Sequence, residues 1–185
     1  REGGVRAPTI AWWPGRIPAG TANAAITGML DVLPTFAKIA GATLPARRID
    51  GLDVSPVLFG AEGAKGHDEF LYYRGMTLEA LRVGKWKLML EGSNAPFRSK
   101  QPKKEAPQRL FDLEADVGES SDVAAKHPEV VGKLLARAAE IEADLGRTEA
   151  GPGVRPLGRF PNPRPVIDHD GKVRPDAVGS AERFP

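Results

Sequence analysis

One long amphipathic stretch constrains the fold of this chain more than any other feature. From Pro128 to Leu145 the apolar residues recur at helical spacing, and Gly146 follows where a helix would end. The expected apolar stripe consists of Val131, Leu134, Leu135, Ala138, Ile141 and Leu145. A helix with a single apolar stripe must bury it against another element, so the fold needs a second layer. We expect His127 to cap this helix.

Four segments ahead of the helix are typical of β-strands, at residues 70–74, 79–83, 86–91 and 109–112. Only Gly84-Lys85 separates the second from the third, and a two-residue loop with glycine predicts a hairpin. In the third strand we expect one face toward the core and the other away from it: Trp86, Leu88 and Leu90 inward, and Lys87, Met89 and Glu91 away. The fold class is therefore α+β, a small antiparallel sheet of about four strands packed on one long C-terminal helix.

The first 66 residues carry weaker patterns. Residues 5–13 are apolar apart from Arg6 and predict a strand, in which Pro8 indicates an edge or a bulge. Residues 31–40 predict a short helix that Asp31 caps and Gly41 ends. One face of that helix carries Val32, Leu33, Phe36, Ile39 and Ala40. Residues 51–60 predict a loop and then a short helical turn.

Composition excludes several classes of function. The formal net charge is +2, too small to favour a nucleic-acid partner. The chain has no cysteine, which excludes disulfides, thiolate metal sites and cysteine nucleophiles within it. No apolar run approaches the roughly 20 residues of a membrane helix, so no membrane partner is expected. Residues 97–109 hold five basic residues and one acid, and we favour a solvated surface loop over an anion-binding one.

Local motifs for chemistry are weak. Residues 112–116 resemble the start of a calcium loop, but valines stand where that loop requires glycine and a bidentate acid, which favours an acidic turn. Residues 60–66 lack the spacing of a phosphate loop. His67, His127 and His169 form no helical metal pair, so a loop or cap role is favoured over catalysis. The adjacent residues 12–13 are tryptophans that could line a carbohydrate groove, but at least one is better interpreted as core.

A set of longer motifs occurs in order along residues 1–145. These are Glu2-Gly3-Gly4-Val5-Arg6-Ala7-Pro8 with Trp13-Pro14-Gly15, Asp31-Val32-Leu33-Pro34-Thr35 with Ala40-Gly41, Asp50-Gly51-Leu52-Asp53 with Ser55-Pro56, Arg82-Val83-Gly84-Lys85-Trp86-Lys87, and Leu110-Phe111-Asp112-Leu113 with Asp116, Gly118 and Glu119. Together they resemble the sulfatase family, nearest to the arylsulfatase A-like enzymes. Val117 departs from the family, which usually has proline there.

The resemblance implies a sulfuric ester hydrolase of alkaline-phosphatase-like fold. In that family a formylglycine, formed from Cys or Ser in a C/S-x-P-x-R motif, attacks sulfur while a calcium ion neutralises the sulfate. No such motif occurs here, so no catalytic residue and no metal ligand is assigned to this segment. Calcium and formylglycine are expected in the parent enzyme outside this segment, with none bound here. The family also makes a periplasmic or secreted location an option, although no targeting segment is visible.

The chain opens in the middle of a family motif, so we expect a catalytic domain to precede Arg1 and to act as its partner. Residues 1–66 would be the end of that α/β domain, 67–146 an α+β subdomain, and 147–185 a Pro/Gly-rich extended tail. Four residues near the expected active site, Glu2, Gly3, Gly4 and Arg6, could form a pocket wall or support one. An ion-paired strand end that shapes the turn is an equally good or better interpretation, and Gly3 and Gly4 would let the backbone turn tightly or approach a neighbour.

Three functions remain open from the sequence. The first is the C-terminal segment of an arylsulfatase-type enzyme for sulfate esters, inert alone. The second is a stand-alone, non-catalytic binding module derived from a sulfatase. The third is a related phosphoryl-transfer enzyme of the same superfamily. Without the large sheet on which they would normally pack, residues 1–41 are expected to expose apolar surface and to promote self-association.

Overall fold

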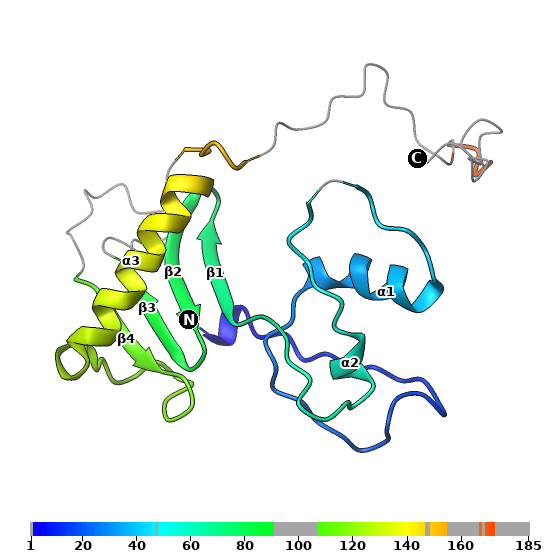
Figure 1. Cartoon of the computed structure of the whole chain (residues 1–185), viewed down its shortest axis with the longest axis horizontal. Helices are drawn as coiled ribbons and strands as arrows, with labels where there is room; N and C mark the ends of the chain where they lie inside the picture. Colours follow the sequence, from blue (N-terminus) through cyan, green and yellow to red (C-terminus); the bar gives the residue numbers. More distant parts are fainter. Residues whose placement is uncertain are drawn as a thin grey trace. The chain divides into compact units, whose positions relative to one another are not determined.

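The computed structural model describes residues 2–46, 48–90, 107–146, 149–154, 167 and 169–172. Arg1–Leu44 and Ile49–Val154 form one compact unit, and Pro45–Arg48 with Arg155–Pro185 form another. The elements discussed below all belong to the first unit (Figure 1). The basic residues 97–106 and most of the Pro/Gly-rich tail lie outside the described residues, so the predictions for them stay predictions.

A four-stranded antiparallel sheet forms the centre of the first unit, as predicted. Its strands lie in the order β1 (Glu69–Arg74), β2 (Thr77–Val83), β3 (Trp86–Met89) and β4 (Arg109–Asp112). Gly84 takes φ +56° in the two-residue turn between β2 and β3, a backbone conformation that favours glycine. The predicted hairpin is therefore confirmed, and its register pairs Val83 with Trp86.

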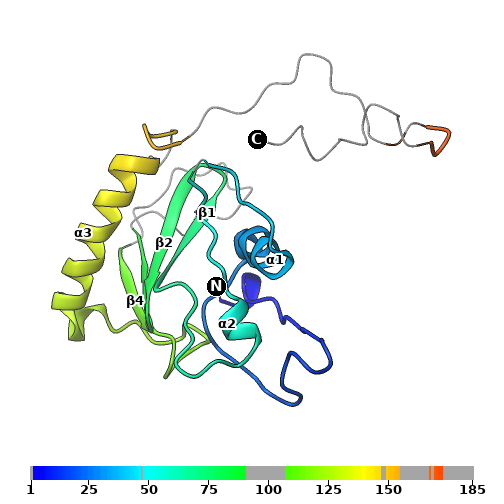
Figure 2. The same cartoon turned by 45° about the vertical axis from the view of Figure 1, so that its right-hand side comes forward.

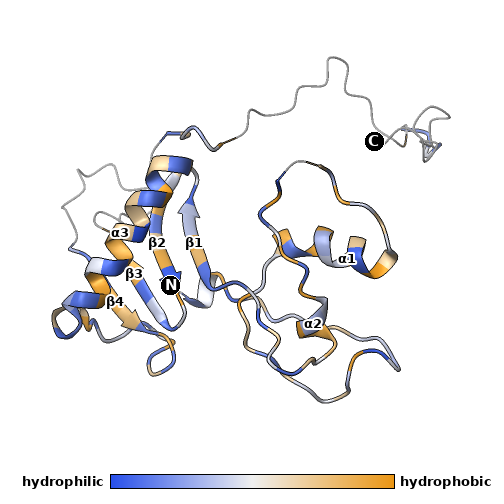
Figure 3. Cartoon of the chain, viewed as in Figure 1, coloured by the Kyte–Doolittle hydropathy of each residue, from blue (hydrophilic) through white to orange (hydrophobic). Residues whose placement is uncertain are grey.

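The long helix α3 (Pro128–Leu145) lies along one face of this sheet in both views (Figures 1 and 2). Leu81, Leu88 and Leu110 are neighbours across three strands and are fully buried beneath it. The helix contributes Leu134, Ala138 and Ile141 to the same core. Apolar and polar residues alternate along α3 and the strands, which gives each a face to bury (Figure 3). The predicted pairing of sheet and helix is thus confirmed.

The start of α3 differs from the prediction in one respect. His127 occupies the N-cap position, but its side chain makes no capping hydrogen bond. Its backbone carbonyl accepts from the N–H groups of Val130 and Val131, while its ring lies 4.8 Å from the Trp86 ring, centroid to centroid. Imidazole caps poorly compared with a short hydroxyl or carboxylate side chain, and the His127 ring instead makes a tilted contact with the indole. A 3-10 turn, η3 (Ala124–Lys126), precedes it.

The N-terminal strand predicted for residues 5–13 is wrong. The structure has a 3-10 turn, η1 (Glu2–Gly4), followed by irregular backbone without strand pairing in the described residues. Ile10 is 93% exposed and Trp12 84% exposed. A strand requires a hydrogen-bonded neighbour, and here the β-prone composition of residues 5–13 meets none.

The predicted short helix is present as α1 (Val32–Ala40), entered through the 3-10 turn η2 (Met29–Asp31). Gly41 ends it with φ +67°, as predicted. The apolar face behaves differently from expectation, because Leu33 and Phe36 are exposed while Thr35 and Ala37 are buried. The short helical turn α2 (Ser55–Leu58) follows a loop, as predicted from residues 51–60.

Candidate functional site

The candidate site is a buried group of charges on the face of the sheet opposite α3. Lys87 points away from the α3 core, as the strand alternation predicts, yet only 1% of its surface is exposed. Its neighbours across the sheet are Arg82 on β2 and Phe111 on β4. The opposite face is therefore not simply solvated, which the sequence interpretation had not foreseen.

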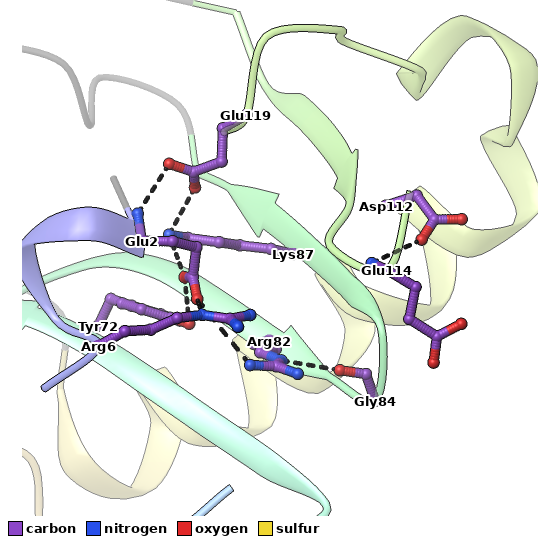
Figure 4. A network of polar contacts seen from close by, with 9 residues as sticks. All are labelled: Glu2, Arg6, Tyr72, Arg82, Gly84, Lys87, Asp112, Glu114 and Glu119. Atoms are coloured by element: carbon purple, nitrogen blue, oxygen red, sulfur yellow. Dashed lines mark hydrogen bonds and ion pairs between the residues drawn. The ribbon is translucent and has the colours of Figure 1, made fainter. Parts of the chain in front are cut away.

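The turn η1 carries Glu2 onto this face, where it is 2% exposed (Figure 4). Its Oε1 accepts from Lys87 Nζ at 2.9 Å and from the Tyr72 hydroxyl at 2.8 Å. Its Oε2 accepts from Arg6 Nε at 2.6 Å, and Arg82 Nη1 lies 3.9 Å from the same oxygen. Every side of the carboxylate therefore faces a donor or a cation, which is what a buried carboxylate requires.

A second carboxylate completes the group from the loop after β4. Glu119 Oε1 lies 2.6 Å from Lys87 Nζ, and its Oε2 accepts from the backbone N–H of Glu2 at 3.0 Å. Glu119 has φ +54°, in the left-handed region that glycine favours. Asp116 supports this turn by accepting from the N–H groups of Ser120 and Ser121. Glu119 thus lies in a sparsely populated conformation that brings its carboxylate to Lys87.

The electrostatics of the group fix its protonation. Burial raises the pKa of Glu2, but the hydrogen bonds from Arg6, Lys87 and Tyr72 outweigh it and lower that pKa to about 2. Burial, and then the hydrogen bond to Glu2, raises the pKa of the Tyr72 hydroxyl above its usual range. At neutral pH Glu2 is ionised and Tyr72 is a neutral donor. Neither is poised for proton transfer near neutrality.

Of the four predicted site residues, two belong to this network. Glu2 is its centre, and Arg6 lies at its edge with 46% of its side chain exposed. Gly3 and Gly4 lie in η1, are exposed, have no positive φ, and a Cβ at either position would meet no atom within 4 Å. A glycine is not required at either position by the described residues. The conformational freedom that glycine offers is therefore not used at Gly3 or Gly4, since neither has a positive φ or a close neighbour.

Lys87, Glu119 and Tyr72 were missed as partners of Glu2. Lys87 and Glu119 both stand in the motifs that resemble the sulfatases, so the sequence marked them without showing that they meet. Charged residues at strand positions usually face solvent, and 85 residues of sequence separate Lys87 from Glu2. These side chains meet Glu2 only because the fold of the whole unit brings η1, the sheet and the loop after β4 together.

A third buried carboxylate, outside the Lys87 network, organises the segment around α1. Asp31 is 1% exposed and accepts from the N–H of Gly28 and the N–H of Leu52, each at 2.8 Å. Its Oδ1 also lies 2.7 Å from His67 Nε2. Asp31 makes no side-chain cap on α1, contrary to prediction, because its own backbone is already helical within η2 and its carboxylate turns back to Gly28. Asp31 links residues 28, 52 and 67 and is therefore a structural hub.

The remaining candidates occupy structural positions. Asp112 accepts from Lys85 Nζ at 2.7 Å and from the N–H of Glu114, which is an acidic turn at a strand end. The prediction that at least one of the two adjacent tryptophans lies in the core is wrong, because Trp12 is 84% and Trp13 42% exposed; Trp13 meets Phe59 edge to face at 6.0 Å. In the described ranges, no three His, Asp or Glu side chains come together in a way that could hold a metal ion. Likewise, no helix among them is long and apolar enough to cross a membrane.

With this geometry established, comparison with known proteins identifies the class. Residues 65–152 match the family described as the C-terminal region of aryl-sulfatase, a range that contains the whole sheet and α3. Bovine arylsulfatase A (Bos taurus) is 32% identical over 204 residues, covering 94% of this chain and 40% of that protein. Human arylsulfatase A is 37% identical over 153 residues, covering 72% of this chain and 30% of that protein. The chain belongs to the sulfatase family and corresponds to the C-terminal portion of its members.

Solved structures agree on the fold. The crystal structure of PsFucS1 sulfatase from Pseudoalteromonas sp. matches with a TM-score of 0.54 over 72% of this chain and 29% of that one, at 21% identity. At that identity the match shows the fold alone. The predicted architecture, a small sheet with a long C-terminal helix from a sulfatase of alkaline-phosphatase-like fold, is confirmed. The chain spans 40% of the length of bovine arylsulfatase A.

Proposed function

We propose that this chain is the C-terminal segment of an arylsulfatase-type sulfuric ester hydrolase and is inert alone. The observation that carries the proposal is the match of residues 65–152 to the C-terminal region of aryl-sulfatase. The site supports it chemically, since the carboxylates of Glu2 and Glu119 are engaged by Lys87 and Tyr72 and take a structural rather than a catalytic arrangement. The network is a scaffold for a neighbouring site.

The cofactors of the parent enzyme, calcium and formylglycine, belong outside this segment in our proposal. Calcium prefers several carboxylate and amide oxygens converging on one point. The described residues do not fit it, because their buried carboxylates already bind cations or backbone N–H groups. No step of the reaction is assigned to a residue of this chain.

The partner we propose is the remaining part of the sulfatase, including its catalytic domain. Its docking surface is the apolar face of α1 with η2, where Met29 is 85%, Leu33 56% and Phe36 61% exposed. Clustered apolar side chains at this exposure mark an interaction surface. We propose Glu2 and Arg6 of the charged network as pocket-wall or supporting residues of the parent enzyme. In the absence of the partner, self-association is expected.

An aryl-sulfate assay with added calcium tests the proposal. The chain alone is expected to show no turnover above background. Extended upstream to include a C/S-x-P-x-R motif, and expressed where that motif is converted to formylglycine, it is expected to hydrolyse the ester. Turnover by the 185-residue chain alone would overturn the claim that it is inert. An extended protein that is loaded with both groups and still inactive on sulfate esters would overturn the claim of enzyme class.

The interface has a test of its own. Phe36→Lys on the exposed face of α1 should lower self-association of the chain in light scattering and should weaken capture by a separately expressed catalytic domain. Lys38→Glu, on the same helix, is the matched control and should leave both unchanged. If both variants behave as the parent chain does, this face is not the docking surface.

A further inference from the structure

The N-terminal segment is held to the sheet in an unusual way. From Glu2 to Arg16 the single buried residue is Glu2, and residues 3–16 are all exposed. No strand pairing joins these residues to the sheet. The polar contacts that join them to it are those of Glu2, so what fixes Glu2 also fixes the start of the segment.

The contacts of Glu2 form a closed ring of three. Lys87 Nζ lies 2.9 Å from the Glu2 carboxylate and 2.6 Å from that of Glu119. Glu119 closes the ring by accepting from the Glu2 backbone N–H. The members come from η1, from β3 and from the loop after β4, and the Lys87 ammonium touches both carboxylates (Figure 4).

We infer that Lys87 is a positioning residue that holds η1 in place on the sheet. Without its ammonium, the two buried carboxylates would lose the cation that bridges them, and their repulsion would weaken the hold of the sheet on Glu2. Arg82 cannot replace it, because its Nη1 lies 3.9 Å from Glu2 and its Nε already donates to the Gly84 carbonyl. Tyr72 donates its hydroxyl to Glu2, and its ring lies 4.1 Å from Lys87 Nζ, so it supports the ammonium without supplying charge.

The rest of the sheet does not depend on this ring. Leu81, Leu88 and Leu110 are buried on the other face against α3. Loss of Lys87 should therefore release η1 locally before it unfolds the core. This inference goes beyond the proposed function, since it concerns how the chain seats its own N-terminal segment whether or not the parent enzyme hydrolyses sulfate esters.

Amide hydrogen exchange on the full chain tests it. Three amides report on the turn: that of Glu2, which donates to Glu119, and those of Val5 and Arg6, which donate to the Glu2 carbonyl. In Lys87→Met these should exchange at least about tenfold faster, while those of α3 stay within about twofold of the parent chain. Lys85→Met is the matched control, because it removes a lysine from the same hairpin. The Lys85 side chain is 39% exposed and pairs with Asp112 outside the ring.

Two further variants keep the test decisive. Lys87→Arg keeps a cation and should restore most of the protection. If Lys87→Met does not fold, Glu2→Gln breaks the ring from the segment side and carries the same expectation. Equal acceleration in η1 and α3 would mean that Lys87 only adds global stability, and unchanged exchange in η1 would mean that other contacts hold the turn. Either result overturns the inference.

Discussion

The ammonium of Lys87 lies 2.6 Å from the carboxylate of Glu119, a residue whose backbone sits at φ +54°. A non-glycine residue in that region carries a conformational cost of roughly 1–2 kcal/mol. The contact with Lys87, and the bond accepted from the Glu2 N–H, offset this cost. Substitutions at Glu119 can therefore measure two contributions separately, the cost of its backbone conformation and the stabilisation from its carboxylate contacts.

Glu119→Ala should be more destabilising than Glu119→Gly. Both remove the carboxylate and leave the Lys87 ammonium with one partner fewer, which costs roughly 3–5 kcal/mol for a buried pair. Only glycine also removes the conformational cost of the positive φ at this position, so the alanine variant should be the less stable by about 1 kcal/mol. Urea unfolding of the two variants and the parent chain measures both differences. Equal stability of the two variants would show that the loop relaxes and stores no strain.

Acid sensitivity should depend on Glu2. Its pKa is about 2 in the folded chain, below the ordinary value of 4.5, so its contribution to stability is complete above pH 4.5 and is lost as the pH falls toward 2. The shift corresponds to a contribution of about 3 kcal/mol at neutral pH. The groups that face Glu2 are Arg6, Tyr72, Arg82, Lys87 and Glu119.

The check is the free energy of unfolding of Glu2→Gln measured from pH 7 to pH 2. This variant should be less stable at pH 7, and its stability should fall less steeply between pH 4.5 and pH 2. Glu69→Gln is the control, because the Glu69 pair with Arg137 is solvent-exposed and contributes less. A Glu2→Gln profile parallel to that of the parent chain would exclude the pKa assigned to Glu2.

Much of the sheet and of α3 could be predicted from the sequence, for identifiable physical reasons. The hairpin at Gly84 and the stripe of α3 depend on local conformation and periodicity, and both were predicted correctly. Lys87 was assigned to the correct face, but its burial depends on η1, which arrives from 85 residues away. The strand at residues 5–13 failed because β-propensity does not supply a partner strand. Sequence patterns report local conformation and periodicity, so they do not show which residues far apart in the sequence come into contact.

Asp31→Asn should loosen the hub around α1. The two carboxylate oxygens accept separately, Oδ2 from the Gly28 N–H and Oδ1 from the Leu52 N–H. Asparagine offers one oxygen and one amide nitrogen, so one of these N–H groups would face another donor, at a cost of about 1–3 kcal/mol. Thermal unfolding is the measurement. Asp53→Asn is the control, because Asp53 accepts only from the Ser55 N–H in a local turn that asparagine forms equally well.

Gly51→Ala should destabilise the chain through a steric clash that Gly3→Ala lacks. A Cβ at Gly51 would lie 1.9 Å from the Leu30 carbonyl oxygen, and backbone atoms cannot move aside as a flexible side chain can. The loop of residues 50–53 would have to shift away from η2, at a cost of about 1–3 kcal/mol or more. A Cβ at Gly3 meets no atom within 4 Å, and its backbone needs no positive φ, so Gly3→Ala should stay within about 0.5 kcal/mol of the parent chain. Denaturant unfolding of both variants decides the matter, and a Gly51→Ala chain as stable as Gly3→Ala would show that the two segments are not packed as closely as the structure places them.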